Sequence, residues 1–85
     1  MPLYLIERNF AEGLALSGDL VAAAMPVLAD TGNHWLFSFL SADKKKMYCL
    51  YESENADAVR ESARRLGLPA DVVIEVDQVR PEAFA

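Results

Sequence analysis

The order of strand-type and helix-type segments constrains the fold of this chain more than any other feature. Residues 3–10 begin with four apolar side chains and then alternate into charge, which predicts a strand. Residues 34–41 and 46–52 are aromatic-rich runs joined by a short polar segment, and they predict a hairpin. Residues 71–80 alternate apolar and polar side chains and predict a fourth strand.

Two segments with helical periodicity lie between these strands. Ser17 stands where an N-cap belongs, and apolar residues follow it at helical spacing up to Gly32. Asn55 is a second candidate cap, and Gly67 is a typical stop signal for the helix that it begins. The first helix therefore precedes the hairpin and the second follows it.

The resulting order, β-α-β-β-α-β, predicts an α+β fold of the ferredoxin-like type. In this fold a four-stranded antiparallel sheet carries both helices on one face. A chain of 85 residues has material for one hydrophobic core, so we expect residues 1–85 to form a single domain. The sheet face turned away from the helices, the open face, is left bare.

Charge and cysteine content exclude several classes of function. A formal net charge of -5 repels a polyanion, so we expect no nucleic-acid partner. No run reaches the roughly 18 consecutive apolar residues of a bilayer span, so we expect no membrane partner. Cys49 is the single cysteine and excludes an internal disulfide, and the first residues do not resemble a signal peptide. We therefore expect a cytoplasmic protein.

We predict the side chains of the open face from the last strand. Val72, Ile74 and Val76 are uniformly apolar, which favours a position under the helices. The residues that the same rule assigns to the open face are Leu3, Leu5, Glu7, Trp35, Phe37, Phe39, Met47, Cys49, Tyr51, Val73, Glu75 and Asp77. So much contiguous apolar surface favours a homodimer joined through this face, a dimeric α+β barrel.

Polar residues among the apolar ones predict a ligand site on the open face, because polar groups are costly to bury without partners. The expected walls of its pocket are Trp35, Phe37, Phe39, Met47 and Tyr51. Cys49 with Glu7 and Glu75 offers a thiolate and two carboxylates to nickel, zinc or another divalent transition metal. Alternatively, Cys49 is a small buried hydrophobic side chain, and the two carboxylates are solvated or ion-paired at strand ends.

Two main classes of function follow from this site. The first is a small homodimeric protein that binds a transition metal of the nickel type, or a small and partly apolar molecule, on the open face. The alternative is a small cofactor-independent isomerase, cyclase or oxygenase in which Glu7 or Glu75 is the general base. A purely structural dimer is a third possibility. The chain has no Gly-rich phosphate loop, CxxC, HExxH or nucleophile-elbow motif.

Several short motifs occur along the chain in a fixed order. They are Tyr4-Leu5-Ile6-Glu7-Arg8, Trp35 ahead of Ser38, Asp43-Lys44 ahead of Tyr48-Cys49-Leu50-Tyr51-Glu52, Ala58-Val59-Arg60-Glu61 with Ala63-Arg64-Arg65, and Gly67-Leu68-Pro69-Ala70 ahead of Ile74-Glu75-Val76. Together they resemble a family of small bacterial ferredoxin-like proteins of largely unknown function that is associated with nickel. The resemblance implies a homodimer and, in some members, bound nickel.

The chain departs from that family at two positions after the tryptophan. Where the family pattern has a histidine and then a tyrosine, this chain has Phe37 and Phe39. Phenylalanine does not ligate a metal, and both substitutions make the open face more apolar. The departure favours a pocket for a small, partly hydrophobic molecule.

Overall fold

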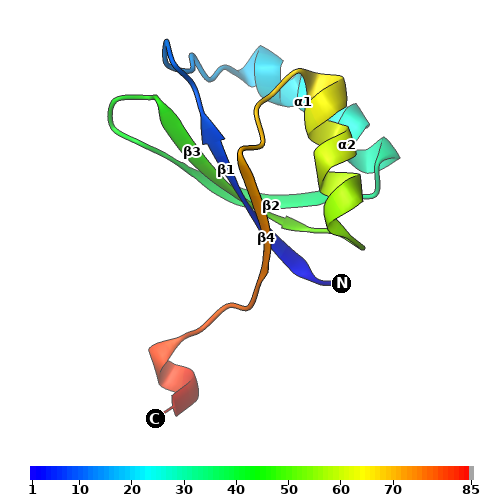
Figure 1. Ribbon diagram of the computed structural model, residues 1–85, viewed down its shortest axis with the longest axis vertical. Coiled ribbons are helices and arrows are strands. Elements are labelled where there is room, and N and C mark those ends of the chain that lie inside the picture. The colour runs from blue at the N-terminus through cyan, green and yellow to red at the C-terminus, as the bar shows by residue number, and fades with distance from the viewer. Residues whose placement is uncertain (85) are drawn as a thin grey trace.

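A four-stranded antiparallel sheet with two helices on one face forms the body of the protein (Figure 1). The computed structural model describes residues 1–84, and the strand order is β2-β3-β1-β4. The elements are β1 (Leu3–Asn9), α1 (Gly18–Asp30), β2 (His34–Leu40), β3 (Lys46–Glu52), α2 (Ala56–Leu66) and β4 (Val72–Val76), followed by a 3₁₀-helix (Pro81–Phe84). The prediction of a ferredoxin-like α+β fold is confirmed.

Both helices begin at the predicted caps. The Ser17 hydroxyl accepts a hydrogen bond from the backbone N–H of Leu20 at 3.2 Å, and the Asn55 side chain accepts one from Ala58 at 2.8 Å. Gly67 ends α2 with a φ of 67°, a left-handed conformation that glycine adopts without a steric penalty. Local sequence signals therefore decide where each helix lies.

The core lies between the helices and the two central strands. Ile6 of β1 and Val59 of α2 are fully buried, and Leu28 of α1 is nearly so. Because β1 pairs with both β3 and β4, its register decides which residues of those strands face the helices. The side chains of the two central strands on the helix-covered face are Tyr4, Ile6, Arg8, Met47, Cys49 and Tyr51.

The predicted orientation of β4 is wrong. Val73 pairs with Ile6 and packs against the core, whereas Val72 and Ile74 are 40% and 49% exposed on the open face. Glu75 is two residues after Val73, so its side chain also points to the helix side of the sheet. It is nevertheless exposed, because β4 is an edge strand. The apolar residues of β4 did not mark the helix side because the open face is itself apolar.

The predicted orientation of β3 is also wrong. Met47, Cys49 and Tyr51 are paired with the residues of β1 that face the helices, and all three are buried. The open face instead receives Tyr48 and Leu50, which pair with residues of β1 that turn away from the core. The whole strand is turned by one residue relative to the prediction, as a register argument allows.

In β2 a β-bulge separates two aromatic residues that were predicted to share a face. The register shifts between Trp35 and Phe37, so that Trp35 pairs with Tyr51 and Phe37 pairs with Leu50. A bulge adds one residue to one strand and reverses the alternation beyond it. Trp35 therefore packs against the core, while Phe37 and Phe39 lie on the open face as predicted.

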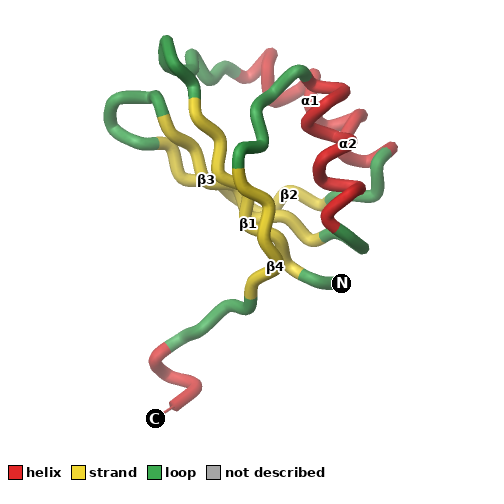
Figure 2. The backbone as a smooth tube through the Cα atoms, in the orientation of Figure 1, coloured by secondary structure: helices red, strands yellow, loops and turns green. Residues whose placement is uncertain are grey.

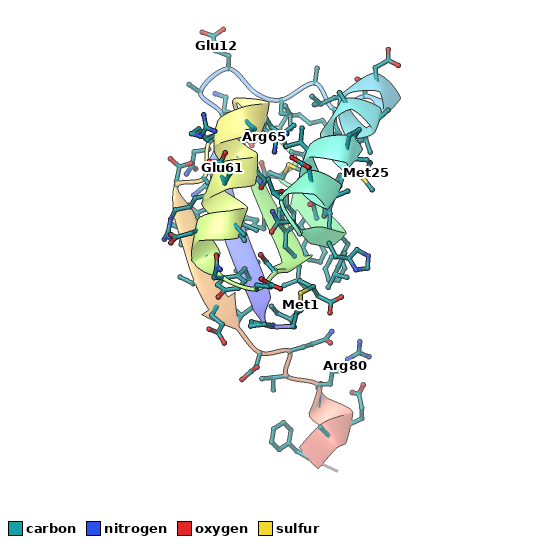
Figure 3. All side chains as sticks on the ribbon, turned by 90° about the vertical axis from the view of Figure 1, so that its right-hand side faces the viewer. Met1, Glu12, Met25, Glu61, Arg65 and Arg80 are labelled. Carbon is teal, nitrogen blue, oxygen red and sulfur yellow. The ribbon has the colours of Figure 1, made fainter. Side chains whose placement is uncertain are left out.

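The carboxyl-terminal segment leaves the sheet after β4. Residues 77–84 extend away from the body of the molecule (Figure 2), and Arg80 stands clear of the sheet (Figure 3). Val79 and Phe84 of this segment are 72% and 78% exposed. Within residues 1–84, no helix is both long enough and apolar enough to span a bilayer.

Candidate functional site

The open face of the sheet is a hollowed apolar surface. Phe37 and Phe39 of β2 are 45% and 67% exposed, and their rings meet edge to face with centroids 5.5 Å apart. A hollow of about 190 Å³ lies beside them. Its lining residues are Leu3, Leu5, Phe37, Phe39, Tyr48, Leu50, Val76, Asp77 and Gln78. A monomer rarely leaves this many neighbouring apolar side chains in water.

The predicted pocket walls are divided between the two faces. Phe37 and Phe39 lie in the hollow of the open face. Trp35, Met47 and Tyr51 instead line a second cavity, on the helix side of the sheet. The prediction that all five share one pocket is wrong, because the bulge in β2 and the register of β3 turn these three side chains toward the helices.

The three predicted metal ligands are not brought together. Glu7 lies on the open face, Cys49 is 2% exposed on the opposite face, and Glu75 is exposed on the edge strand. Among residues 1–84, no group of three or more histidine, cysteine, aspartate or glutamate side chains is placed to hold a metal ion. Cys49 belongs to the hydrophobic core, which supports its reading as a small buried hydrophobic side chain.

The two carboxylates proposed for proton transfer do not lie in an apolar cleft. Glu7 is 3.6 Å from the ammonium nitrogen of Lys46, and it accepts a hydrogen bond from the Asn9 amide at 3.3 Å. Glu75 is exposed. The apolar surroundings that the proposed general base requires are therefore found around neither carboxylate.

One imidazole–carboxylate pair does lie at the edge of the open face. His34 begins β2 and pairs in register with Glu52 at the end of β3, which in turn pairs with Leu3. The His34 Nδ1 atom is 3.4 Å from the nearer Glu52 carboxylate oxygen. These two side chains are donors that a borderline metal ion accepts.

A second cavity, not foreseen from the sequence, lies between the sheet and the helices. It has a volume of about 140 Å³, is partly enclosed, and is lined almost entirely by apolar side chains. Its polar members are Arg8, which is 1% exposed, and Tyr51, which is 3% exposed. Burial raises the pKa of the Tyr51 phenol, with the nearby Arg8 opposing the shift.

The alternation of side chains along β1 indicates that Arg8 is buried, although the sequence analysis did not predict Arg8 as a site residue. It continues the alternation of Tyr4 and Ile6 along β1, and both of those residues are buried. A charged residue in phase with two buried apolar residues is uncommon, because burying a charge is costly. That position alone marks Arg8 as a candidate functional residue.

The element order and the sheet topology define the chain as a ferredoxin-like α+β protein. The chain belongs to the nickel responsive protein SCO4226-like family, whose model matches residues 4–76. The crystal structure of SCO4226 from Streptomyces coelicolor A3(2) is similar to this chain at 22% sequence identity, with a TM-score of 0.75. That likeness covers 92% of this chain and 99% of SCO4226, and it shows the shared fold. No curated protein matches the chain.

Proposed function

We propose that the protein is a homodimeric ligand-binding protein whose two copies meet through their open faces. The carrying observation is the apolar surface formed by Phe37, Phe39 and Ile74, which are 45%, 67% and 49% exposed. A second copy related by a two-fold axis places the same patch opposite itself and buries both. The arrangement corresponds to a dimeric α+β barrel.

The carboxyl-terminal segment supports the same partner. Asp77 and Gln78 line the hollow of the open face, and Val79 and Phe84 beyond them are exposed. The segment extends from the sheet rather than folding back on its own core (Figure 1). A second copy seated on the open face would also provide apolar surface for this segment.

The ligand we propose for the space between the sheets is a small, partly apolar molecule. Each copy brings a hollow of about 190 Å³, and the walls of that hollow are mostly leucine and aromatic side chains. Tyr48 and Gln78 add polar groups that could orient a bound molecule. We place this binding protein in the cytoplasm, in keeping with its single cysteine.

Nickel is the second candidate ligand, favoured by the family of the chain and by the His34–Glu52 pair. Glu7, Cys49 and Glu75 do not fit a common metal ion, because they are divided between the two sides of the sheet. His34 and Glu52 together supply one nitrogen and one oxygen donor, and the remaining positions would go to water or to the second copy.

Sedimentation equilibrium of the full chain tests the dimer. We expect a concentration-dependent mass that approaches twice 9.4 kDa. A mass of one chain at all concentrations would refute the proposed dimer.

Calorimetric titration with nickel chloride, on protein purified without a histidine tag, tests the second candidate. We expect His34→Ala to abolish nickel binding and Cys49→Ala to preserve it. Equal binding by His34→Ala would exclude this pair as the site, and no heat in the unchanged protein would exclude nickel as a ligand.

A further inference from the structure

Within the part of the chain that the structure describes, the guanidinium of Arg8 is a buried cation without a carboxylate partner. The residue is 1% exposed, and none of the ion pairs formed within residues 1–84 includes it. A charge that is removed from water without a counter-charge is costly, so such groups are usually paired or bind a ligand. The other four arginines each form an ion pair with a carboxylate at the surface: Arg60, Arg64, Arg65 and Arg80.

Two neutral oxygen atoms hold the guanidinium in place. Nη1 donates to the carbonyl oxygen of Pro69 at 2.7 Å, and Nη2 donates to the hydroxyl oxygen of Tyr51 at 3.0 Å. Arginine has further N–H donors beyond these two. Because the Tyr51 oxygen accepts from Arg8, its own hydrogen is free to donate to a third group. The two side chains therefore present a corner of hydrogen-bond donors that carries one positive charge.

This corner lies in the wall of the cavity on the helix side of the sheet. The other walls come mainly from α1, the segment before it, and the core strands, and include Leu14, Ala24, Leu28 and Trp35. The volume of about 140 Å³ is close to that of apolar protein cavities of ~150 Å³ that bind benzene. The cavity therefore has room for one small ring or a short branched chain.

We propose that this cavity binds a small organic monocarboxylate with a single apolar ring or a short branched chain, and that Arg8 and Tyr51 hold the carboxylate. A carboxylate pairs with the planar guanidinium through two parallel hydrogen bonds, and the apolar walls cover the rest of the ligand. One cation balances one negative charge. A monoanion is favoured over a phosphate or a dicarboxylate because the chain already carries a net charge of -5.

The proposed site is separate from the open face. Tyr51 and Arg8 turn toward the helices, whereas the proposed dimer forms through the residues that turn away from them. The carboxylate site therefore stands even if the chain is a monomer.

Titration with benzoate, followed by ¹H–¹⁵N NMR, tests the proposal on the full chain. Trp35 is the only tryptophan and lines the cavity, so its indole N–H gives a single, assigned reporter signal. We expect benzoate to shift this signal in a saturable way. Benzyl alcohol, which has a similar ring and no charge, is expected to bind about tenfold more weakly or worse, because it loses the charge-assisted hydrogen bonds.

Three variants separate ligand binding from a purely structural role of Arg8. Tyr51→Phe removes only the hydroxyl, and we expect about tenfold weaker benzoate binding by a folded protein. Ala24→Leu fills part of the cavity and is expected to abolish binding. Arg8→Met, if it folds, should lose the preference for benzoate over benzyl alcohol. Met25→Gln, at an exposed position of α1 outside the lining of the cavity, is the matched control and should leave the affinity unchanged.

The proposal has clear contrary outcomes. If Arg8 merely fastens β1 to the Pro69 carbonyl, benzoate will leave the Trp35 signal unmoved at millimolar concentration. Equal affinities for benzoate and benzyl alcohol would show an apolar cavity in which the charge has no role. Unchanged binding by both Tyr51→Phe and Ala24→Leu would place the ligand elsewhere on the molecule.

Discussion

Replacing Phe39 by glutamine is the sharpest test of the proposed dimer. Phe39 lies on the open face, is 67% exposed, and contacts Phe37 in an edge-to-face pair. It contributes little to the core of its own copy, so the substitution should leave the single chain folded. Its main effect should fall on the association of two copies.

The size of that effect follows from the exposed area. An aromatic side chain has ~200 Å² of surface. With 67% of the residue exposed, a second copy covers at most ~130 Å² of each Phe39, or ~3 kcal/mol at ~25 cal/mol per Å². The two-fold axis repeats the contact, so the dimer loses up to ~6 kcal/mol. If the second copy covers only half of this area, Phe39→Gln still costs ~3 kcal/mol of association free energy, which raises the dimer Kd roughly a hundredfold.

Sedimentation equilibrium over a range of protein concentrations measures this shift. Met25→Gln is the matched control, because Met25 is 50% exposed on α1 and lies far from the open face (Figure 3). We expect Met25→Gln to associate like the unchanged protein. If Phe39→Gln keeps the original Kd while the unchanged protein is a dimer, the open face is not the interface.

Three further substitutions test the core, a helix cap and the buried tyrosine. Ile6→Ala empties a fully buried position and should lower the free energy of unfolding in urea by about 2–5 kcal/mol; a loss well under ~1 kcal/mol would contradict the orientation of β1. Asn55→Ala should cost about 1 kcal/mol in the same assay because Ala58 loses its cap, whereas Asn55→Asp should preserve stability. Burial raises the pKa of Tyr51 above 10.0, so the folded protein keeps a proton that the unfolded chain releases. Stability should therefore fall as the pH rises above about 10, and thermal unfolding of Tyr51→Phe should show a smaller alkaline loss.

Local signals in the sequence were sufficient for the fold. Caps at Ser17 and Asn55 and the stop at Gly67 place both helices, because hydrogen bonding and backbone conformation at helix ends depend on a few neighbouring residues. The runs of apolar and aromatic residues likewise locate the four strands. Once these elements are placed, the short connections leave few topologies to consider.

The faces of the strands could not be predicted in the same way. Alternation identifies a buried face only when the other face is polar, and in β4 both sets include valine, at Val72 and Val73. In β2 the bulge reverses the alternation between Trp35 and Phe37, and nothing in the residues themselves reveals it. The predicted site combined residues of both faces, because β3 and β4 were each assigned one residue out of phase and the bulge in β2 was not anticipated.

Charged residues in β1 show what decides the assignment when both faces are apolar. Glu7 and Arg8 are neighbours in a strand, so their side chains point to opposite sides of the sheet. The expectation that charged side chains face water is therefore wrong for one of the two. Glu7 forms an ion pair with Lys46 at the rim of the open face, whereas Arg8 lies in the core and donates hydrogen bonds to the neutral oxygen atoms of Pro69 and Tyr51. A sequence that placed arginine there for stability alone would do better with leucine or methionine. Arg8 is the residue that departs from the apolar pattern of the core, and a negatively charged ligand bound beside it would supply the counter-charge that residues 1–84 do not.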